Sequence, residues 1–119
     1  MLRIDPRSLR VTGSVPLLHG QPEQVAYGDD YVWVTNQEDD SITRIDPRSL
    51  SPFTIDQVGD GPSGIAAGAG AVFVANLLDG TVARIDPNTR RVTEPVRMGI
   101  GADGVVIAAG SAWVTLHEQ

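Results

Sequence analysis

Cysteine and lysine are both absent from this 119-residue sequence, and aromatic residues make up only 5% of it. Without cysteine, disulfide bonds and thiolate metal sites are excluded, while the redox compartment is left open. No apolar stretch approaches the roughly 18 residues that a membrane-spanning helix needs. The nine basic residues are all arginine, and the formal net charge of −6 is a poor match to a phosphate backbone. We therefore expect neither nucleic acid nor a membrane among the partners.

The N-terminus also lacks the apolar core of a secretory signal, because Met1–Pro6 already contains an arginine and an aspartate. We expect the chain as written to stay in the cytoplasm, an expectation that does not apply to a piece cut from a longer protein. Hydrophobic residues make up 41% of the chain, which argues against disorder. The 13 glycines and 8 prolines fall mostly at repeated positions, as expected for breaks between short strands.

The motif Arg-Ile-Asp-Pro occurs three times, beginning at Arg3, Arg44 and Arg84. The separations are 41 (44 − 3) and 40 (84 − 44) residues. A period near forty is the length of one four-stranded blade of a β-propeller. We therefore expect one all-β repeat domain spanning 1–119, with repeats at approximately 3–43, 44–83 and 84–119.

Each repeat contains a strand rich in β-branched residues around a central aromatic residue. Trp33, Phe73 and Trp113 occupy this position, 40 residues apart, and we interpret them as packing between blades rather than as ligand-stacking groups. No stretch has sustained helical periodicity, so we expect no helix. The expected strands are 2–5, 10–18, 24–27, 31–35, 41–46, 54–58, 65–67, 71–75, the strand that leads into Arg84, 91–98, 105–107 and 111–115.

The order of these strands predicts how the ends of the chain behave. With the strands of a blade labelled A to D from the channel outward, the chain reads C-D, A-B-C-D, A-B-C-D, A-B. The total is three four-stranded blades, one of them split between the termini. Three blades are too few to close a ring. We expect a homodimeric six-bladed propeller in which the two chains share two blades, and the alternative is a piece of a longer propeller.

The blade pattern resembles the YVTN-type β-propeller repeat and, more loosely, the virginiamycin B lyase-like propellers. The resemblance covers nearly the whole chain. The sequence departs from the family pattern at Leu116, where asparagine is expected. The matching residues are Val32–Asn36 and Ser41–Pro47 in one copy, Gly59–Ala66, Val72–Asn76 and Asp79–Pro87 in the next, and Gly104, Val105 and Ala112–Thr115 in the third.

The resemblance to the lyase-like propellers implies a metal, histidine bases and a glutamate. The two histidines here, His19 and His117, fall in different repeats, so no catalytic residue and no metal ligand is carried over. We expect a non-catalytic scaffold that presents a face to a ligand or protein. The alternatives are a metal-assisted lyase in the channel, with a cluster built from symmetry-related chains, and a fragment or engineered repeat without activity of its own.

The segment Gly59–Gly64 fits the glycine-rich fingerprint of dinucleotide-binding proteins. That fingerprint works only between a strand and a helix whose N-terminus faces the pyrophosphate. Here the next predicted element is another strand, so we interpret the segment as a loop between blades.

The loops between strands D and A and between strands B and C are expected to share one face of the ring. They carry many carboxylates, which favour a cation, a small molecule or a basic protein as ligand, or else form a solvated surface. A divalent cation is the one candidate cofactor. For Asn36 and Asn76, capping of a turn by the side chain is the alternative role. The candidate ligand-binding residues are Asn36, Asp39, Asp40, Asp60, Asn76, Asp79 and Asp103.

The opposite face is expected to collect the Asp-Pro turns together with Arg7, Arg48 and Arg90. We interpret these arginines as structural rather than as an anion site. The arginines that open each motif are expected to interact either with the aspartate of their own motif or with a neighbouring blade. Exposed pairs of this kind contribute only about 0–1 kcal/mol each.

Overall fold

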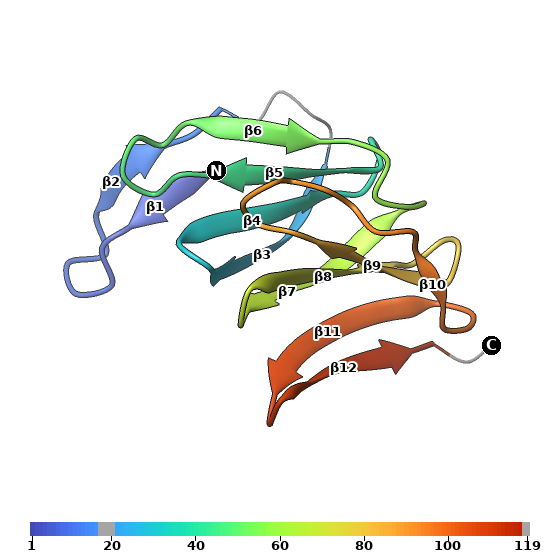
Figure 1. Cartoon of the computed structure of the whole chain (residues 1–119). Coiled ribbons are helices and arrows are strands. Elements are labelled where there is room, and N and C mark those ends of the chain that lie inside the picture. Colours follow the sequence, from blue (N-terminus) through green and yellow to red (C-terminus); the bar gives the residue numbers. More distant parts are fainter. Residues whose placement is uncertain (17–20, 118–119) are drawn as a thin grey trace.

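The computed structural model describes residues 1–16 and 21–117, and these contain twelve strands and no helix. The all-β expectation is therefore confirmed, and no helix within the described residues could cross a membrane. The strands form two four-stranded and two two-stranded antiparallel sheets (Figure 1). The first two sheets along the chain are the N-terminal half-blade, β1 (Leu2–Ile4) and β2 (Val11–Ser14), and blade 1, β3 (Pro22–Gly28), β4 (Tyr31–Asn36), β5 (Ser41–Ile45) and β6 (Pro52–Ile55).

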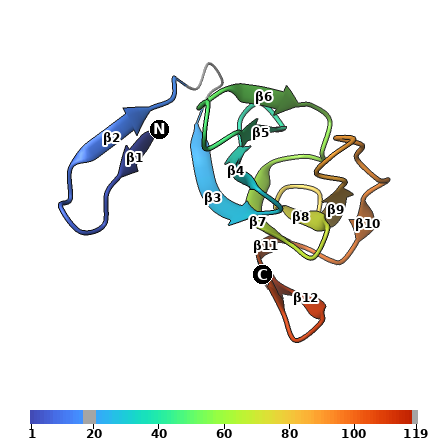
Figure 2. The ribbon, with the colours of Figure 1, turned by 60° about the vertical axis from the view of Figure 1, so that its left-hand side comes forward.

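The second half of the chain contains the same two kinds of sheet in the opposite order, with the four-stranded blade first and the half-blade last. The sheets are blade 2, β7 (Pro62–Gly68), β8 (Ala71–Asn76), β9 (Thr81–Ile85) and β10 (Val96–Arg97), and the C-terminal half-blade, β11 (Ala102–Ala108) and β12 (Ser111–Leu116). The order C-D, A-B-C-D, A-B-C-D, A-B that the sequence predicted is thus the observed one. The two half-blades lie at opposite ends of the arc, and the N-terminal hairpin stands apart from the rest in Figure 2.

Some strand boundaries differ from the prediction. The outer strand expected at 54–58 is β6, Pro52–Ile55, because its residues must pair with β5, with Phe53 opposite Arg44. The expected loop at Gly59–Gly64 ends earlier, since Pro62 already pairs with Asn76 as the first residue of β7. A bulge between Pro62 and Ile65 takes the intervening residues out of the regular ladder. The end of the strand expected at 10–18 falls at residues 17–18, outside the described residues.

The Asp-Pro turns join strands C and D, and their aspartates cap the backbone as predicted. Asp5 and Asp46 each accept the N–H of the residue two positions later at 2.8 Å. The turn closes one residue later than a four-residue turn would, because the Leu9 N–H donates to the Asp5 carbonyl at 2.8 Å. Leu9 takes a left-handed conformation to make this bond, with φ of 59°.

The main core lies between blades 1 and 2. Trp33 is fully buried there and packs with Ile65, Val72 and Ile85. Its indole N–H donates to the Gly28 carbonyl at 3.1 Å, so the burial leaves no unpaired donor. The expectation that the aromatic residue of strand B packs between blades is therefore confirmed for Trp33.

The inner strands of successive blades approach each other very closely. A Cβ atom placed on Gly28 would lie 2.4 Å from the carbonyl oxygen of Ala67 in the next blade. One placed on Gly64 would lie 2.1 Å from the carbonyl oxygen of Asp103. Both distances are far shorter than real contacts, so only glycine lets the inner strands pack this tightly around the axis.

The opening arginine of the repeated motif reaches across to the next blade. Arg44 donates from Nη1 to the carbonyl of Pro87 at 2.8 Å, and Arg3 donates to the carbonyl of Pro47 at 3.3 Å. Each of the first two motifs therefore supplies a donor to the following copy of itself. We call this bond the arginine clasp, and of the two roles considered for these arginines it favours the interaction with a neighbouring blade.

Replacing Trp33 with alanine is expected to lower the free energy of unfolding by about 3–5 kcal/mol, because it opens a large cavity between the two complete blades. Urea denaturation at fixed protein concentration measures this loss. Leu78→Ala is the matched control, because Leu78 is 68% exposed and its truncation should cost less than about 0.5 kcal/mol. Equal losses in the two variants would contradict the placement of the core.

Candidate functional site

The loops 37–40, 56–61, 77–80 and 98–101, which we call the loop face, are the B–C and D–A connections of the blades. A hollow of about 480 Å³ opens between three of them. The structure brings four of the predicted site residues together around it, and Asp56 joins them. The lining residues are Asp39, Asp40, Asp56, Gln57, Gly59, Asp60 and Asp79.

Two of these carboxylates hold the loops to one another. Asp40 accepts the backbone N–H of Gly61 at 2.8 Å, which ties the B–C loop of blade 1 to the loop that enters blade 2. Asp79 accepts the N–H of Asp60 at 3.0 Å and the hydroxyl of Thr81 at 2.6 Å. The acidic hollow is therefore framed by cross-linked loops, and part of its charge is engaged in holding that frame.

The two predicted asparagines lie in the interior instead of at the rim. Asn36 and Asn76 are the last residues of β4 and β8, and both are fully buried. The Asn36 amide donates to the hydroxyls of Ser41 and Thr43, while the Asn76 amide donates to the Val58 carbonyl. These bonds support the turn-capping interpretation, although the Oδ1 atom of each is buried without a hydrogen-bond partner.

Asp103 lies inside β11, where the sequence had suggested a loop, because the strand begins at Ala102. Its carboxylate connects two residues from other parts of the chain. The Ser63 hydroxyl donates to Oδ1 at 2.7 Å, and Nε2 of His117 lies 2.7 Å from Oδ2. Ser63 is buried, whereas the His117 side chain is 63% exposed, so this network runs from the blade interface outward to solvent.

The environment of Asp103 favours its ionised form. The hydroxyl of Ser63 is the main cause and the neighbouring His117 adds to it, so together they hold the pKa of the Asp103 carboxyl below its usual value against a smaller opposing effect of burial. The carboxylate accepts from the serine, so the histidine does not contact the serine hydroxyl as a base would. The arrangement is that of a structural tie and not of an activated nucleophile.

A second hollow of the loop face, about 550 Å³, lies between blade 2 and the C-terminal half-blade. Asp79 lines both hollows, so the two adjoin. Asp79 is the only carboxylate among the described residues that line it, and Arg97 and His117 line it as well, so it is less acidic than the first hollow.

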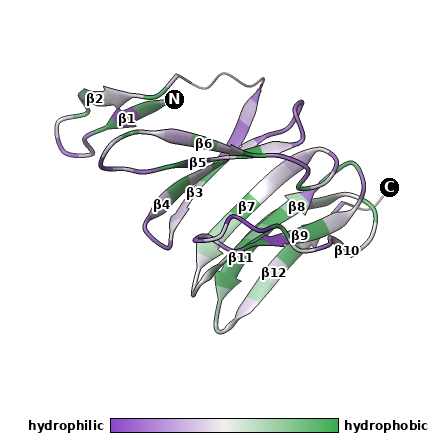
Figure 3. Ribbon diagram, turned by 45° about the horizontal axis from the view of Figure 1, so that its top comes forward, coloured by the Kyte–Doolittle hydropathy of each residue, from purple (hydrophilic) through white to green (hydrophobic). Residues whose placement is uncertain are grey.

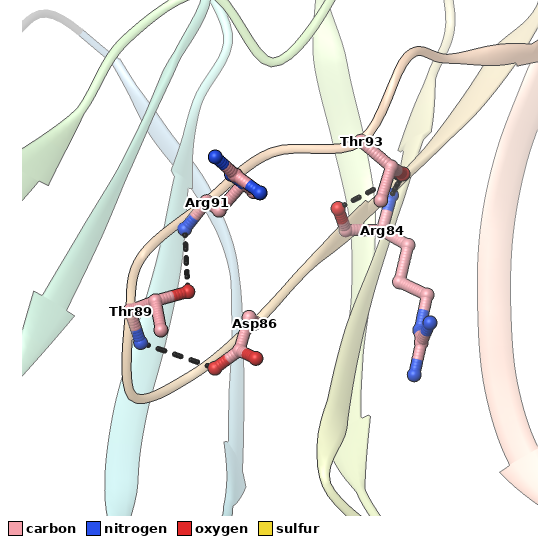
Figure 4. A pocket seen from close by; sticks show the side chains of 5 residues that line it. All are labelled: Arg84, Asp86, Thr89, Arg91 and Thr93. Atoms are coloured by element: carbon pink, nitrogen blue, oxygen red, sulfur yellow. Dashed lines mark hydrogen bonds between the residues drawn. The ribbon is translucent and has the colours of Figure 1, made fainter.

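A third hollow, about 620 Å³, belongs to the opposite face and is lined by Arg84, Asp86, Thr89, Arg91 and Thr93. Figure 4 shows the Arg84 side chain extending away from the turn that holds Asp86 and Thr89. The backbone N–H groups of Thr89 and Asn88, in that order, hold the pKa of Asp86 below its usual value. These bonds form the Asp-Pro turn itself.

The metal of the lyase-like propellers finds no matching set of ligands in the described residues. Within 1–16 and 21–117, no group of three or more His, Asp or Glu side chains is placed to hold a metal ion. Asp103 and His117 form only a pair, and His19 lies outside the described residues. The divalent cation considered for the loop face therefore stays a prediction.

Sequence reasoning missed the contact of Ser63 and His117 with Asp103. Part of the signal was present, because residues 23, 63 and 103 share one repeat position at the start of strand A. The partner at 117 sits just after strand B of the last repeat and reaches Asp103 only through the pairing of β11 with β12. Predicting that contact requires the pairing register of β11 with β12, which cannot be read from the sequence alone.

No model of a known protein family matches the sequence, and no curated protein is significantly similar to it. Solved structures do match. Virginiamycin B lyase from Staphylococcus aureus superposes with a TM-score of 0.82 at 19% identity, over 96% of this chain and 41% of that one. The chain is a β-propeller-like repeat protein.

Two further structures support the same fold. A streptogramin B lyase structure gives a TM-score of 0.78 at 17% identity, over 92% of this chain and 39% of the other. Hydrazine synthase from Kuenenia stuttgartiensis gives 0.75 at 18% identity, over 88% and 32%. The chain thus spans less than half the length of each of these three solved structures. At these identities the likeness shows the fold and not the activity.

Replacing Asp103 with asparagine is expected to lower stability at neutral pH by less than about 1 kcal/mol, because the carboxylate is 35% exposed. The folded pKa lies below the unfolded value of 3.8. The contribution is therefore fully present above that unfolded pKa and is lost as the pH falls through the folded pKa. Urea titrations from neutral to strongly acidic pH should show the two proteins converging in acid.

Ser63→Ala is the matched variant for this experiment, since it removes the main cause of the lowered pKa and keeps the carboxylate. In the Ser63→Ala background, the pH range over which Asp103→Asn changes the free energy of unfolding should be narrower than in the wild-type background. A difference in stability that persists unchanged into strong acid would show that Asp103 acts through packing instead of through its charge.

Proposed function

We propose that this protein is a non-catalytic binding scaffold whose loop face receives a cationic segment of a partner protein. The observation that carries the proposal is the first hollow, where Asp56 and Asp60 are exposed beside three further aspartates. Carboxylates gathered in one concavity sum to a negative potential that attracts basic groups and repels phosphates. The net charge of −6 acts in the same direction.

The rigidity of the hollow supports this role. The bonds from the Gly61 and Asp60 amides to Asp40 and Asp79 fix the loops before any partner arrives. A site that is already ordered loses less conformational entropy on binding, so more of the contact energy appears as affinity.

A lyase is the second candidate, because the chain is similar in fold to virginiamycin B lyase and to a streptogramin B lyase. The arrangement of the described residues gives this candidate less support. The single histidine among them, His117, contacts Asp103, and Asp103 in turn accepts from Ser63. No described histidine is placed beside a nucleophile or within a group of metal ligands.

A fluorescently labelled oligo-arginine peptide tests the scaffold. Anisotropy should report binding that weakens as salt is added. Asp56→Asn combined with Asp60→Asn should weaken it several-fold, up to about tenfold, because each exposed charge pair is worth about 0–1 kcal/mol. Asp30→Asn is the control, since it removes one carboxylate from turn 29–30 on the opposite face. Equal effects of the two changes, or no salt-sensitive binding, would mean that the loop face is only a solvated surface.

Incubation with a streptogramin-type lactone tests the lyase. Liquid chromatography coupled to mass spectrometry separates an intact lactone from a ring-opened product. We expect the lactone to be recovered intact, because no described histidine is free of the Ser63–Asp103–His117 network. Ring opening that exceeds a protein-free control would overturn the non-catalytic assignment.

A further inference from the structure

The C-terminal end of the arc exposes what the interior of the arc buries. Trp113 occupies the repeat position of Trp33, and its indole N–H makes the equivalent bond, to the Ala108 carbonyl at 3.0 Å. Trp33 is fully buried by blade 2, whereas Trp113 is 59% exposed and Val106 beside it is 55% exposed. The side chain is thus already held in place for a following blade. Figure 3 shows hydrophobic stretches along β12 with no blade beyond it.

The N-terminal end exposes the complementary surface. Val25 and Tyr27 in β3 occupy the repeat positions of Ile65 and Ala67, which in β7 pack against blade 1. Val25 is 61% exposed and Tyr27 is 64% exposed, but Ile65 is only 7% exposed. One end of the arc therefore presents the tryptophan side of a blade interface, and the other end presents the side that normally covers it.

The half-blades are complementary in their strands as well. The C-terminal half-blade ends at β12, a B strand without a C strand, and β1 of the N-terminal half-blade is a C strand without a B strand. Within blade 1, Trp33 pairs with Arg44 and Val34 pairs with Thr43. Carried over by the repeat, this register places Trp113 opposite Arg3 and Val114 opposite Leu2.

The arginine clasp is also incomplete at both ends. Arg3 and Arg44 each donate to the proline carbonyl of the next motif. Arg44 is half-buried, whereas Arg84 is exposed, and its guanidinium has no hydrogen-bond acceptor among the described residues. Arg84 interacts electrostatically with Asp86 of its own turn. At the other end, no described side chain donates to the Pro6 carbonyl. Arg84 borders the hollow of the opposite face in Figure 4.

We propose that a second copy of this chain binds head to tail, with β1 of one copy pairing with β12 of the other to complete a four-stranded blade. Trp113 is then covered by the partner's Val25 and the partner's Tyr27. Arg84 donates to the carbonyl of the partner's Pro6, beside the hollow of about 620 Å³. Two such contacts close a six-bladed ring, which leaves neither end exposed. This proposal does not rest on the function proposed for the loop face.

The mass of the wild-type chain in solution tests the assembly directly. Light scattering coupled to size exclusion at micromolar concentration should give twice the mass of the 119-residue chain. Arg84→Ala should raise the dimer dissociation constant about a hundredfold, since it removes one charged hydrogen bond at each of the two contacts, and each bond is equivalent to about tenfold or about 1.4 kcal/mol. Arg91→Ala, which lines the same hollow, should change it little. A folded monomer, or a mass that grows in steps beyond two chains, would overturn the proposal.

Disulfide trapping tests the register, because these 119 residues contain no cysteine. Leu2→Cys with Val114→Cys should give a covalently linked dimer on a non-reducing gel, as directly opposed strand residues lie within disulfide range. Leu2→Cys with Val106→Cys is the control, because β11 lies one strand farther away, beyond that range. Equal cross-linking in both variants, or none in either while circular dichroism shows a native β spectrum, would overturn the register.

Discussion

The stability of this chain depends on the face-to-face packing of one blade against the next. A blade is apolar on both sides, so it is stable only where another blade covers it. Trp33 is the clearest example of this packing, since it is fully buried against Ile65, Val72 and Ile85 of blade 2. The arginine clasp lies at the outer end of the same interface, and the contact of Gly28 with Ala67 lies at the inner end. The repeated sequence encodes an interface as much as it encodes a sheet.

The repeat made much of the architecture predictable. The spacing of the three Arg-Ile-Asp-Pro motifs implied the strand order, and the observed order is the same. Boundaries were less accessible where the backbone departs from a regular strand. The bulge after Pro62 hid the start of β7, because a glycine-rich segment is indistinguishable from a loop until its partner strand is known.

The candidate site was predictable only as a face and not as a set of contacts. The gathering of Asp39, Asp60 and Asp79 follows from loop position alone, which the strand order determines. The burial of Asn36 and Asn76 does not follow from it, because burial depends on how neighbouring segments cover the end of each strand. Likewise the link from Ser63 through Asp103 to His117 joins two blades, so its geometry depends on inter-blade packing.

The two faces of the arc differ in how strictly they follow the repeat. The Asp-Pro turns recur with the same aspartate bond at Asp5, Asp46 and Asp86, which is what a structural element requires. The B–C loops instead change from Gln37–Asp40 to Leu77–Gly80, although the strands around them superpose in register. Variation on a constant frame is where binding specificity resides in repeat folds. The internal comparison of the repeats thus independently points to the loop face.

The geometry of the ends decides between a ring and a filament. A head-to-tail contact between identical chains continues indefinitely unless the rotation it imposes returns to the start. Each chain contributes three blades, so closure by two chains requires each blade to turn by one sixth of a circle. Gly28 and Gly64 bear on that turn, because they let each A strand lie against the backbone of the next. A side chain at either position would force neighbouring blades apart, and a ring of fixed circumference leaves no room for that.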